Sequence, residues 1–219
     1  MALTLVIGNK NYSSWSLRPW LAMKMAGIAF AEIRIPLNQP DTKANILRHC
    51  PSGKVPCLID EGEEGALTVW DSLAICEYVN EAHAAQRLWP AASAARARAR
   101  SAAAEMHSGF AALRTHLPMD IRARSLGRGA EAKAREDVAA DIARISALWA
   151  EALAASRGGF LFGEFSIADA FFAPVVMRFI TYGVGLAPPL AAYRDRIAAL
   201  APMQDWIAAA AAEAERLDY

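Results

Sequence analysis

Three serine hydroxyls lie where a helix is predicted to begin. Residues 12–18 read Tyr-Ser-Ser-Trp-Ser-Leu-Arg and follow a short apolar run at Leu3–Ile7, which predicts a buried strand. The first N–H groups of a helix have no intrahelical acceptor and lie at the positive end of its dipole, so they attract anions. A hydroxyl at that place can donate a further hydrogen bond to the anion. Taken alone, however, a serine here is most simply an N-cap.

A second segment offers main-chain hydrogen-bonding groups to a ligand. Residues 52–56 read Ser-Gly-Lys-Val-Pro and precede a predicted strand, and a proline at a strand start loses no ladder hydrogen bond. An ordinary X–Pro bond is cis in only about 5–6% of cases. A cis Val55–Pro56 bond would turn the Val55 N–H and C=O outward, where they could pair with a peptide as an added strand does. The alternative is an ordinary turn into an edge strand.

An acid and a hydroxyl mark a third place where a strand ends and a helix begins. At Asp71 and Ser72 the carboxylate could bind an ammonium group, while the hydroxyl and the helix N-terminus bind a carboxylate. That pair of contacts would hold both ends of an α-amino acid, although a plain helix cap explains the residues equally well. Together the three segments supply a donor to a thiolate, a peptide-pairing backbone and an amino-acid clamp. This combination fits glutathione, a tripeptide with a free γ-glutamyl end and a thiol.

Two regions of different composition must form the elements that position these segments. The first 84 residues predict the order β-α-β-α-β-β-α, in which strands at residues 55–60 and 66–70 flank a hairpin turn at residues 61–65. Residues 85–91 form a linker. Alanine-rich helices follow at residues 92–219, because apolar residues step by three or four along Val138–Leu153. Further helices are expected at residues 105–117, 163–179, 190–200 and 203–217, and a polar connection at residues 122–129.

Composition excludes several classes of protein. The 219 residues are 55% hydrophobic, which is typical of a folded chain, and basic and acidic residues both number 23. This balance argues against nucleic acid as a partner. Three cysteines without a C-x-x-C pair predict neither a disulfide framework nor a metal site. With no apolar run long enough to cross a membrane and no signal peptide, we expect a cytoplasmic protein without a membrane partner.

The sequence resembles a cytosolic glutathione transferase over nearly its whole length. Residues 13–18 are similar to the Ser-Ser-Cys-Ser-x-Arg signature of the zeta class, the maleylacetoacetate isomerases. Residues 51–56 match the family's Pro-x-Gly-x-Val-Pro, and Asp71 with Ser72 matches its acid–serine pair. The linker residues 88–90 and the segment 163–169 resemble the interdomain stretch and the buried capping motif; at the latter, Ser166 and Asp169 have the spacing of a capping box.

This resemblance implies a fold, a site and an assembly. The fold is a thioredoxin-like α/β domain at residues 1–84 joined to an all-α domain at residues 92–219, forming a homodimer. Glutathione is the cosubstrate and a small electrophile the second substrate. A cis Val55–Pro56 bond is expected. The thiol is activated by Ser13 with Ser14 as its helper, Tyr12 is an outside candidate, and Ser16 is expected to face away. The residues expected to bind glutathione are Lys54, Val55, Pro56, Asp71 and Ser72.

Two positions depart from the zeta pattern. Trp15 stands where the signature has cysteine, and Cys50 stands where the family usually has asparagine. The expected activity is therefore conjugation of the glutathione thiolate to an electrophile. The alternatives are isomerisation of a maleyl-type diacid, which a cationic residue such as Arg178 would help, and a non-catalytic scaffold of the same fold.

Overall fold

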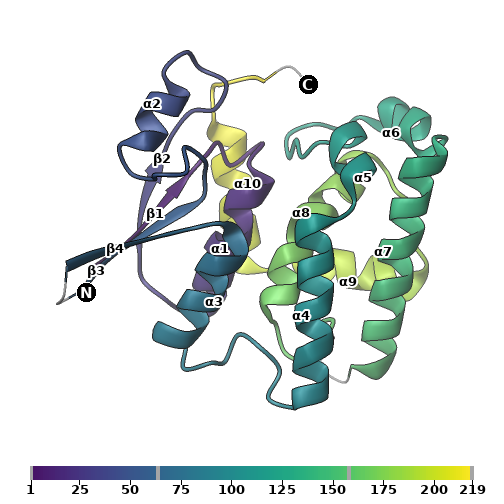
Figure 1. The fold of residues 1–219 in the computed structure, drawn as a ribbon. Helices are drawn as coiled ribbons and strands as arrows, with labels where there is room; N and C mark the ends of the chain where they lie inside the picture. Colours follow the sequence, from purple (N-terminus) through teal and green to yellow (C-terminus); the bar gives the residue numbers. More distant parts are fainter. Residues whose placement is uncertain (1, 63–64, 157–158, 218–219) are drawn as a thin grey trace.

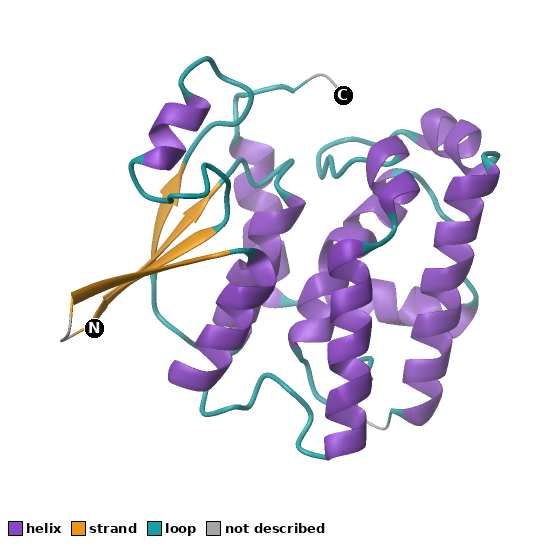
Figure 2. Cartoon of the chain, viewed as in Figure 1, coloured by secondary structure: helices purple, strands orange, loops and turns teal. Residues whose placement is uncertain are grey.

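A four-stranded mixed sheet and a bundle of helices make up the molecule (Figures 1 and 2). The structure is a computed structural model that describes residues 2–62, 65–156 and 159–217. The N-terminal half follows the predicted order: β1 (Ala2–Ile7), α1 (Ser14–Met25), β2 (Ala31–Arg34), α2 (Thr42–Leu47), β3 (Cys57–Gly62), β4 (Gly65–Trp70) and α3 (Ser72–Ala82). Glu63 and Glu64 of the expected hairpin turn lie outside the described residues.

The sheet separates two apolar layers because successive side chains of a strand point to opposite faces. Its strand order is β2-β1-β3-β4, with β1 parallel to β2 and antiparallel to β3. On β1, Leu5 and Ile7 face the main core beneath α1 and α3, whereas Val6 faces a small cluster that includes Ile46 of α2. Helices therefore cover both faces of the sheet, as expected of a thioredoxin-like domain.

The helical half is built around one buried helix. Fourteen residues of α8 (Ile167–Thr181) are buried, and it packs against α1, so the core is continuous between the two halves. The helices around it are α4 (Ser93–Ser108), α5 (Ala111–His116), α6 (Leu126–Lys133), α7 (Glu136–Ala155), α9 (Pro188–Ala198) and α10 (Ala201–Ala212). The capping box is confirmed: the Ser166 N–H and hydroxyl both donate to Asp169 Oδ2, at 2.9 and 3.1 Å.

Several helix boundaries differ from the prediction, including the start of α8 at Ile167 instead of residue 163. The helix expected at residues 105–117 is the end of α4 and the whole of α5, separated at Phe110, whose φ of 55° lies in the left-handed region. The connection expected at residues 122–129 contains the start of α6. The last helix ends at Ala212 instead of continuing to Leu217, because the following segment leaves the helix to contact the N-terminal half. No helix within the described residues is long and apolar enough to span a membrane.

Candidate active site

The register of the sheet brings the three predicted segments to one edge. Cys57 at the start of β3 pairs with Val6 near the end of β1 and with Trp70 at the end of β4. The segment before β3 and the segments after β1 and β4 therefore leave the sheet at the same end. Ligands of open α/β sheets bind at such strand ends.

Ser13 caps α1 and is paired with another serine. Its Oγ accepts from Ser16 N at 3.4 Å and lies 2.7 Å from Ser16 Oγ. Ser16 Oγ also accepts from Gly8 N at 3.1 Å, and the Ser16 side chain is fully buried between Ser13 and the loop that follows β1. When Ser16 donates to Ser13, the Ser13 proton is left for a ligand.

Ser14 is linked to a buried cation of the helical domain. Its Oγ accepts from Arg178 Nη2 at 3.2 Å, and the Nε of the same guanidinium donates to Leu117 O at 2.9 Å. Both side chains are buried. A hydroxyl that accepts from a cation becomes a better donor, so the Ser14 proton is also suited to an anion.

Positive charge gathers around Trp15, between the two domains. Arg18 stacks on Trp15 and on Phe171 of α8, with its Cζ 4.1 and 4.7 Å from the ring centroids, and Arg114 lies 5.4 Å from Trp15. Burial, with the charges of Arg178 and Arg114, lowers the pKa of Arg18 to about 9, so the group stays protonated at neutral pH. The tryptophan that replaces the signature cysteine is thus packed among cations.

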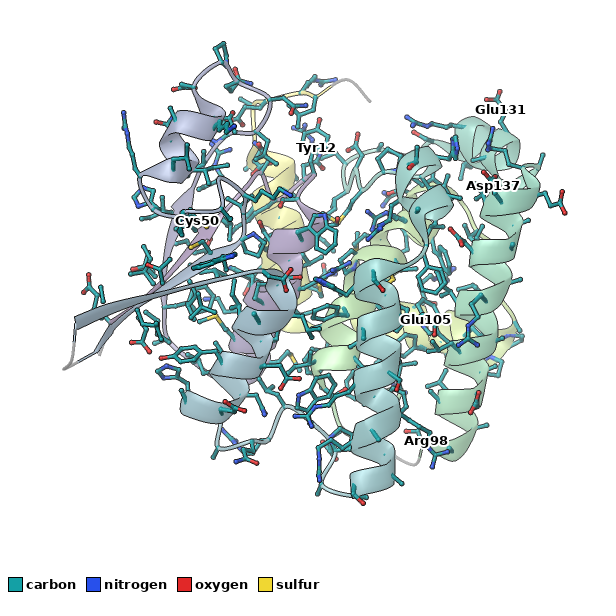
Figure 3. All side chains as sticks on the ribbon, viewed as in Figure 1. Tyr12, Cys50, Arg98, Glu105, Glu131 and Asp137 are labelled. Atoms are coloured by element: carbon teal, nitrogen blue, oxygen red, sulfur yellow. The ribbon has the colours of Figure 1, made fainter. Side chains whose placement is uncertain are left out.

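The segment before β3 leaves main-chain groups open. The Val55–Pro56 bond is cis, as predicted. Among the described residues, neither the N–H nor the C=O of Val55 takes part in a hydrogen bond. Lys54 is exposed, with its N–H donating to Ser52 Oγ at 3.3 Å. Cys50, labelled in Figure 3, contacts the same hydroxyl at 3.0 Å and so stabilises this turn.

Asp71 caps α3 with one oxygen and keeps the other for a second partner. Oδ1 accepts from Leu73 N and Ala74 N at 2.8 and 3.3 Å, which realises the helix-cap interpretation. Oδ2 lies 3.3 Å from Nε2 of His107, on α4. Ser72 is buried, and its hydroxyl accepts from Arg18 Nη1 at 3.5 Å.

His107 is a site residue that sequence reasoning missed. Its ring lies edge-on to Trp15, with 5.3 Å between the ring centroids, and its Nε2 contacts Asp71. His107 therefore connects two of the three segments across the domain boundary. Burial lowers its pKa, as do the charges of Arg18 and Arg114, while Asp71 opposes the shift. Its spacing from other residues carries no motif, so nothing in the sequence connects it to Asp71.

The hydroxyl of Tyr12 is bound by the C-terminal part of the chain. It accepts from Arg122 Nη2 at 3.0 Å and from Leu217 N at 3.1 Å. In Figure 3 Tyr12 lies between the sheet domain and the helices. These contacts hold the Tyr12 hydroxyl against Arg122 and the C-terminal segment. No group of side chains within the described ranges could hold a metal ion.

Comparisons with known proteins point to one family. The model of the glutathione S-transferase N-terminal domain matches residues 12–82, and that of the glutathione S-transferase C-terminal domain matches residues 132–209. No curated protein matches the chain.

Solved structures agree with the family models. A maleylacetoacetate isomerase from Anaeromyxobacter dehalogenans, with glutathione bound in its active site, is 27% identical, with 94% of this chain and 95% of that chain covered and a TM-score of 0.66. A glutathione-bound theta class glutathione S-transferase from Xanthomonas axonopodis pv. citri is 25% identical, with coverages of 94% and 97% and a TM-score of 0.65. A glutathione transferase homologue from Burkholderia, at 21% identity, shares the fold, with coverages of 97% and 100% and a TM-score of 0.70.

Proposed function

Because the chain belongs to the glutathione S-transferase family, we propose that it conjugates the thiolate of glutathione to an electrophilic small molecule. The observation that carries the proposal is the convergence of the three segments at one end of the sheet, set by the pairing of Cys57 with Val6 and Trp70. An anion-binding helix start, an open main chain and an acid–serine pair then lie around one ligand-sized region.

Each segment has a part of glutathione to bind. The open N–H and C=O of Val55, preceding Pro56, pair with the main chain of the cysteinyl residue, and exposed Lys54 is available to the glycyl carboxylate. Oδ2 of Asp71 takes the γ-glutamyl ammonium. The hydroxyl of Ser72 and the start of α3 take the γ-glutamyl carboxylate.

The start of α1 stabilises the thiolate. A free thiol has a pKa of about 8.5, and lowering it by about two units needs roughly 2.7 kcal/mol. A charge-assisted hydrogen bond contributes about 1.5–3 kcal/mol, and a helix dipole about 0.3–1 kcal/mol. We assign the donating hydroxyl to Ser13; Ser14, polarised by Arg178, adds a second donor. No side-chain base is then needed.

A second reaction is favoured by the buried cations. In isomerisation of a maleyl-type diacid, the thiolate adds to the double bond, the new single bond rotates, and the thiolate leaves again. Arg178 donates to Ser14, and the guanidiniums of Arg18 and Arg114 lie over the neighbouring Trp15. Together they would attract a dicarboxylate. The resemblance to the Anaeromyxobacter maleylacetoacetate isomerase supports this candidate. Trp15 in place of the signature cysteine argues against it.

One binding test and two activity assays separate these activities from a scaffold role. The purified protein is tested for retention on immobilised glutathione, then assayed with a chlorinated aromatic acceptor and with maleylacetoacetate. Retention and conjugation of the aromatic acceptor are the expected results. Turnover of maleylacetoacetate alone would favour the isomerase. Failure to bind glutathione would leave the non-catalytic scaffold as the remaining candidate function.

We also propose that the chain forms a homodimer. Alanines of α4 and α7 line a hollow at the surface, and small side chains allow helices to approach closely: Ala95, Ala102, Ala152 and Ala155. Light scattering at micromolar concentration should give twice the chain mass of 23.6 kDa. A mass near that of one chain would contradict the proposal.

A further inference from the structure

The loop between β1 and α1 (residues 8–13) ends at Ser13 and leads directly into Ser14, the first residue of α1, and it contains a tight turn. The carbonyl oxygen of Asn9 accepts from Tyr12 N at 3.2 Å and from Ser13 N at 2.8 Å. The turn directs the two intervening amides, those of Lys10 and Asn11, away from the loop itself. Because buried amides without an acceptor are costly, these two N–H groups need a partner from elsewhere.

That partner is a carboxylate about two hundred residues further along the chain. Glu213 caps the C-terminal end of α10, and its Oε1 accepts from Lys10 N at 2.6 Å while its Oε2 accepts from Asn11 N at 3.1 Å. The Glu213 side chain is only 6% exposed. Two charge-assisted hydrogen bonds from one carboxylate to successive amides fix both the position and the orientation of the turn.

Other groups of the helical domain hold the remaining main-chain atoms of this loop. Trp206 Nε1 donates to Lys10 O at 2.8 Å, and Ile121 N donates to Asn11 O at 3.3 Å. The Asn11 side chain donates to Asp120 Oδ1 at 2.8 Å and accepts from Arg122 N at 2.9 Å. These contacts attach the loop to the helical domain. Glu213 is the charged acceptor of its main-chain amides, and Asp120 is that of the Asn11 side chain.

The positively charged side chains near Glu213 do not compete with the loop amides for its carboxylate. Arg34 Nη1 lies 3.7 Å from Oε1, beyond hydrogen-bond distance, and Arg122 donates to the main-chain carbonyl of Glu213. Lys10 directs its ammonium to Glu32, at 2.7 Å. The carboxylate therefore makes its short contacts with the loop amides.

We propose that Glu213 is a positioning residue for thiol activation, acting through the loop that ends at Ser13 and leads into Ser14. The inference rests on the proposed function, because it concerns the same hydroxyls. A displacement of about 1 Å at a reacting group can reduce a rate by about a hundredfold. Loss of the carboxylate should therefore reduce thiolate stabilisation while the more distant clamp at Asp71 still binds glutathione.

The test compares Glu213→Gln with Glu215→Gln in the full chain. The amide keeps the size of Glu213 but can accept only through one oxygen, and its NH₂ group opposes a loop N–H. Glu215 is a matched control, since its carboxylate contacts Arg34 at 2.9 Å and not the loop amides. The measurements are the pKa of the thiol of bound glutathione, from thiolate absorbance against pH, and kcat and KM for glutathione.

We expect Glu213→Gln to raise the thiol pKa by about one unit. At pH values below that pKa, kcat should be about tenfold lower than in the parent. The KM for glutathione should change less than about threefold, and Glu215→Gln should behave as the parent. If Glu213→Gln has the thiol pKa and kcat of the parent, this inference is overturned but the proposed function is not. A parent protein that leaves the thiol pKa at its value in free glutathione overturns the proposed function, and this inference with it.

Hydrogen exchange of the parent gives a second measurement that does not depend on the folding of the variant. The amides of Lys10 and Asn11 should exchange slowly, as expected for N–H groups bound to a buried carboxylate. Exchange of both at the rate of an unstructured peptide would overturn the inference.

Discussion

Replacement of Ser13 by alanine tests the chemistry proposed for the start of α1. The hydroxyl is the only group that Ser13→Ala removes, and a hydrogen bond from it to a thiolate contributes about 1.5–3 kcal/mol. At about 1.36 kcal/mol per pKa unit, the thiol pKa of bound glutathione should rise by about one to two units. The dipole of α1 and the hydroxyl of Ser14 remain, so the pKa should stay below that of free glutathione.

The structure also gives the side effects of this substitution. Ser13→Ala removes an N-cap, which costs about 1 kcal/mol of stability, but Ser16 keeps its contact with Gly8 N. Ser14→Ala removes a partner of the buried Arg178 guanidinium, so it should destabilise the fold by about 1–3 kcal/mol and raise the thiol pKa less. Tyr12→Phe is the comparison variant, because the Tyr12 hydroxyl lies against Arg122 and Leu217 and outside the Ser13–Ser16 pair.

The assay is a titration of the thiolate absorbance of the glutathione complex against pH, with glutathione affinity measured by calorimetry. Affinity should change little in Ser13→Ala, because Val55 and Asp71 are intact. Titration curves of Ser13→Ala and Ser14→Ala that both coincide with the parent's would refute the mechanism. A shift in Ser14→Ala alone would transfer the donating role to Ser14.

Three further predictions concern the surroundings of the site. Asp71→Asn and Ser72→Ala should each weaken glutathione binding by about 1–3 kcal/mol in calorimetry, because a ligand charge loses its partner; unchanged affinity in both would make them helix caps only. The pKa of His107 is lowered on folding, so the unfolded chain binds the His107 proton more tightly than the folded protein does. The stability that neutral His107 contributes is therefore present above about pH 6.5 and is lost as the pH falls. Urea unfolding should therefore show the advantage of the parent over His107→Gln shrinking between about pH 7 and pH 5, and a constant difference would contradict this. All three cysteines are buried, and burial raises the pKa of the Cys57 and Cys76 thiols. The native protein should therefore resist alkylation by iodoacetamide at pH 8, whereas the denatured chain should react at three sites.

Local sequence signals predicted the N-terminal half well. β1 is a short apolar run followed by Gly8 and Asn9, and β2 alternates apolar and charged residues. The sheet edge where the strands end follows from their order. The capping box at Ser166 and Asp169 was likewise readable, because both partners lie within one helical turn. Predictions succeeded where the interacting residues are neighbours in the chain.

Contacts between distant residues account for what the sequence did not reveal. The end of α10 at Ala212 has no local signal, since alanine and glutamate favour helix; it follows from the contacts of Glu213 with Lys10 and Asn11. The break at Phe110 places an aromatic residue at positive φ, which is uncommon and carries no sequence signature. The approach of His107 to Asp71 requires the two domains to be docked.

The attachment of the β1–α1 loop to the end of the chain also has a consequence for biosynthesis. Lys10 leaves the ribosome long before its partner Glu213, from which it is separated by 203 positions. At about 5–20 residues per second, the interval is roughly 10–40 s. During translation the nascent sheet can pair its strands, yet the loop beside Ser13 lacks its acceptor throughout. The β1–α1 loop can therefore take up its observed conformation only after Glu213 has been synthesised.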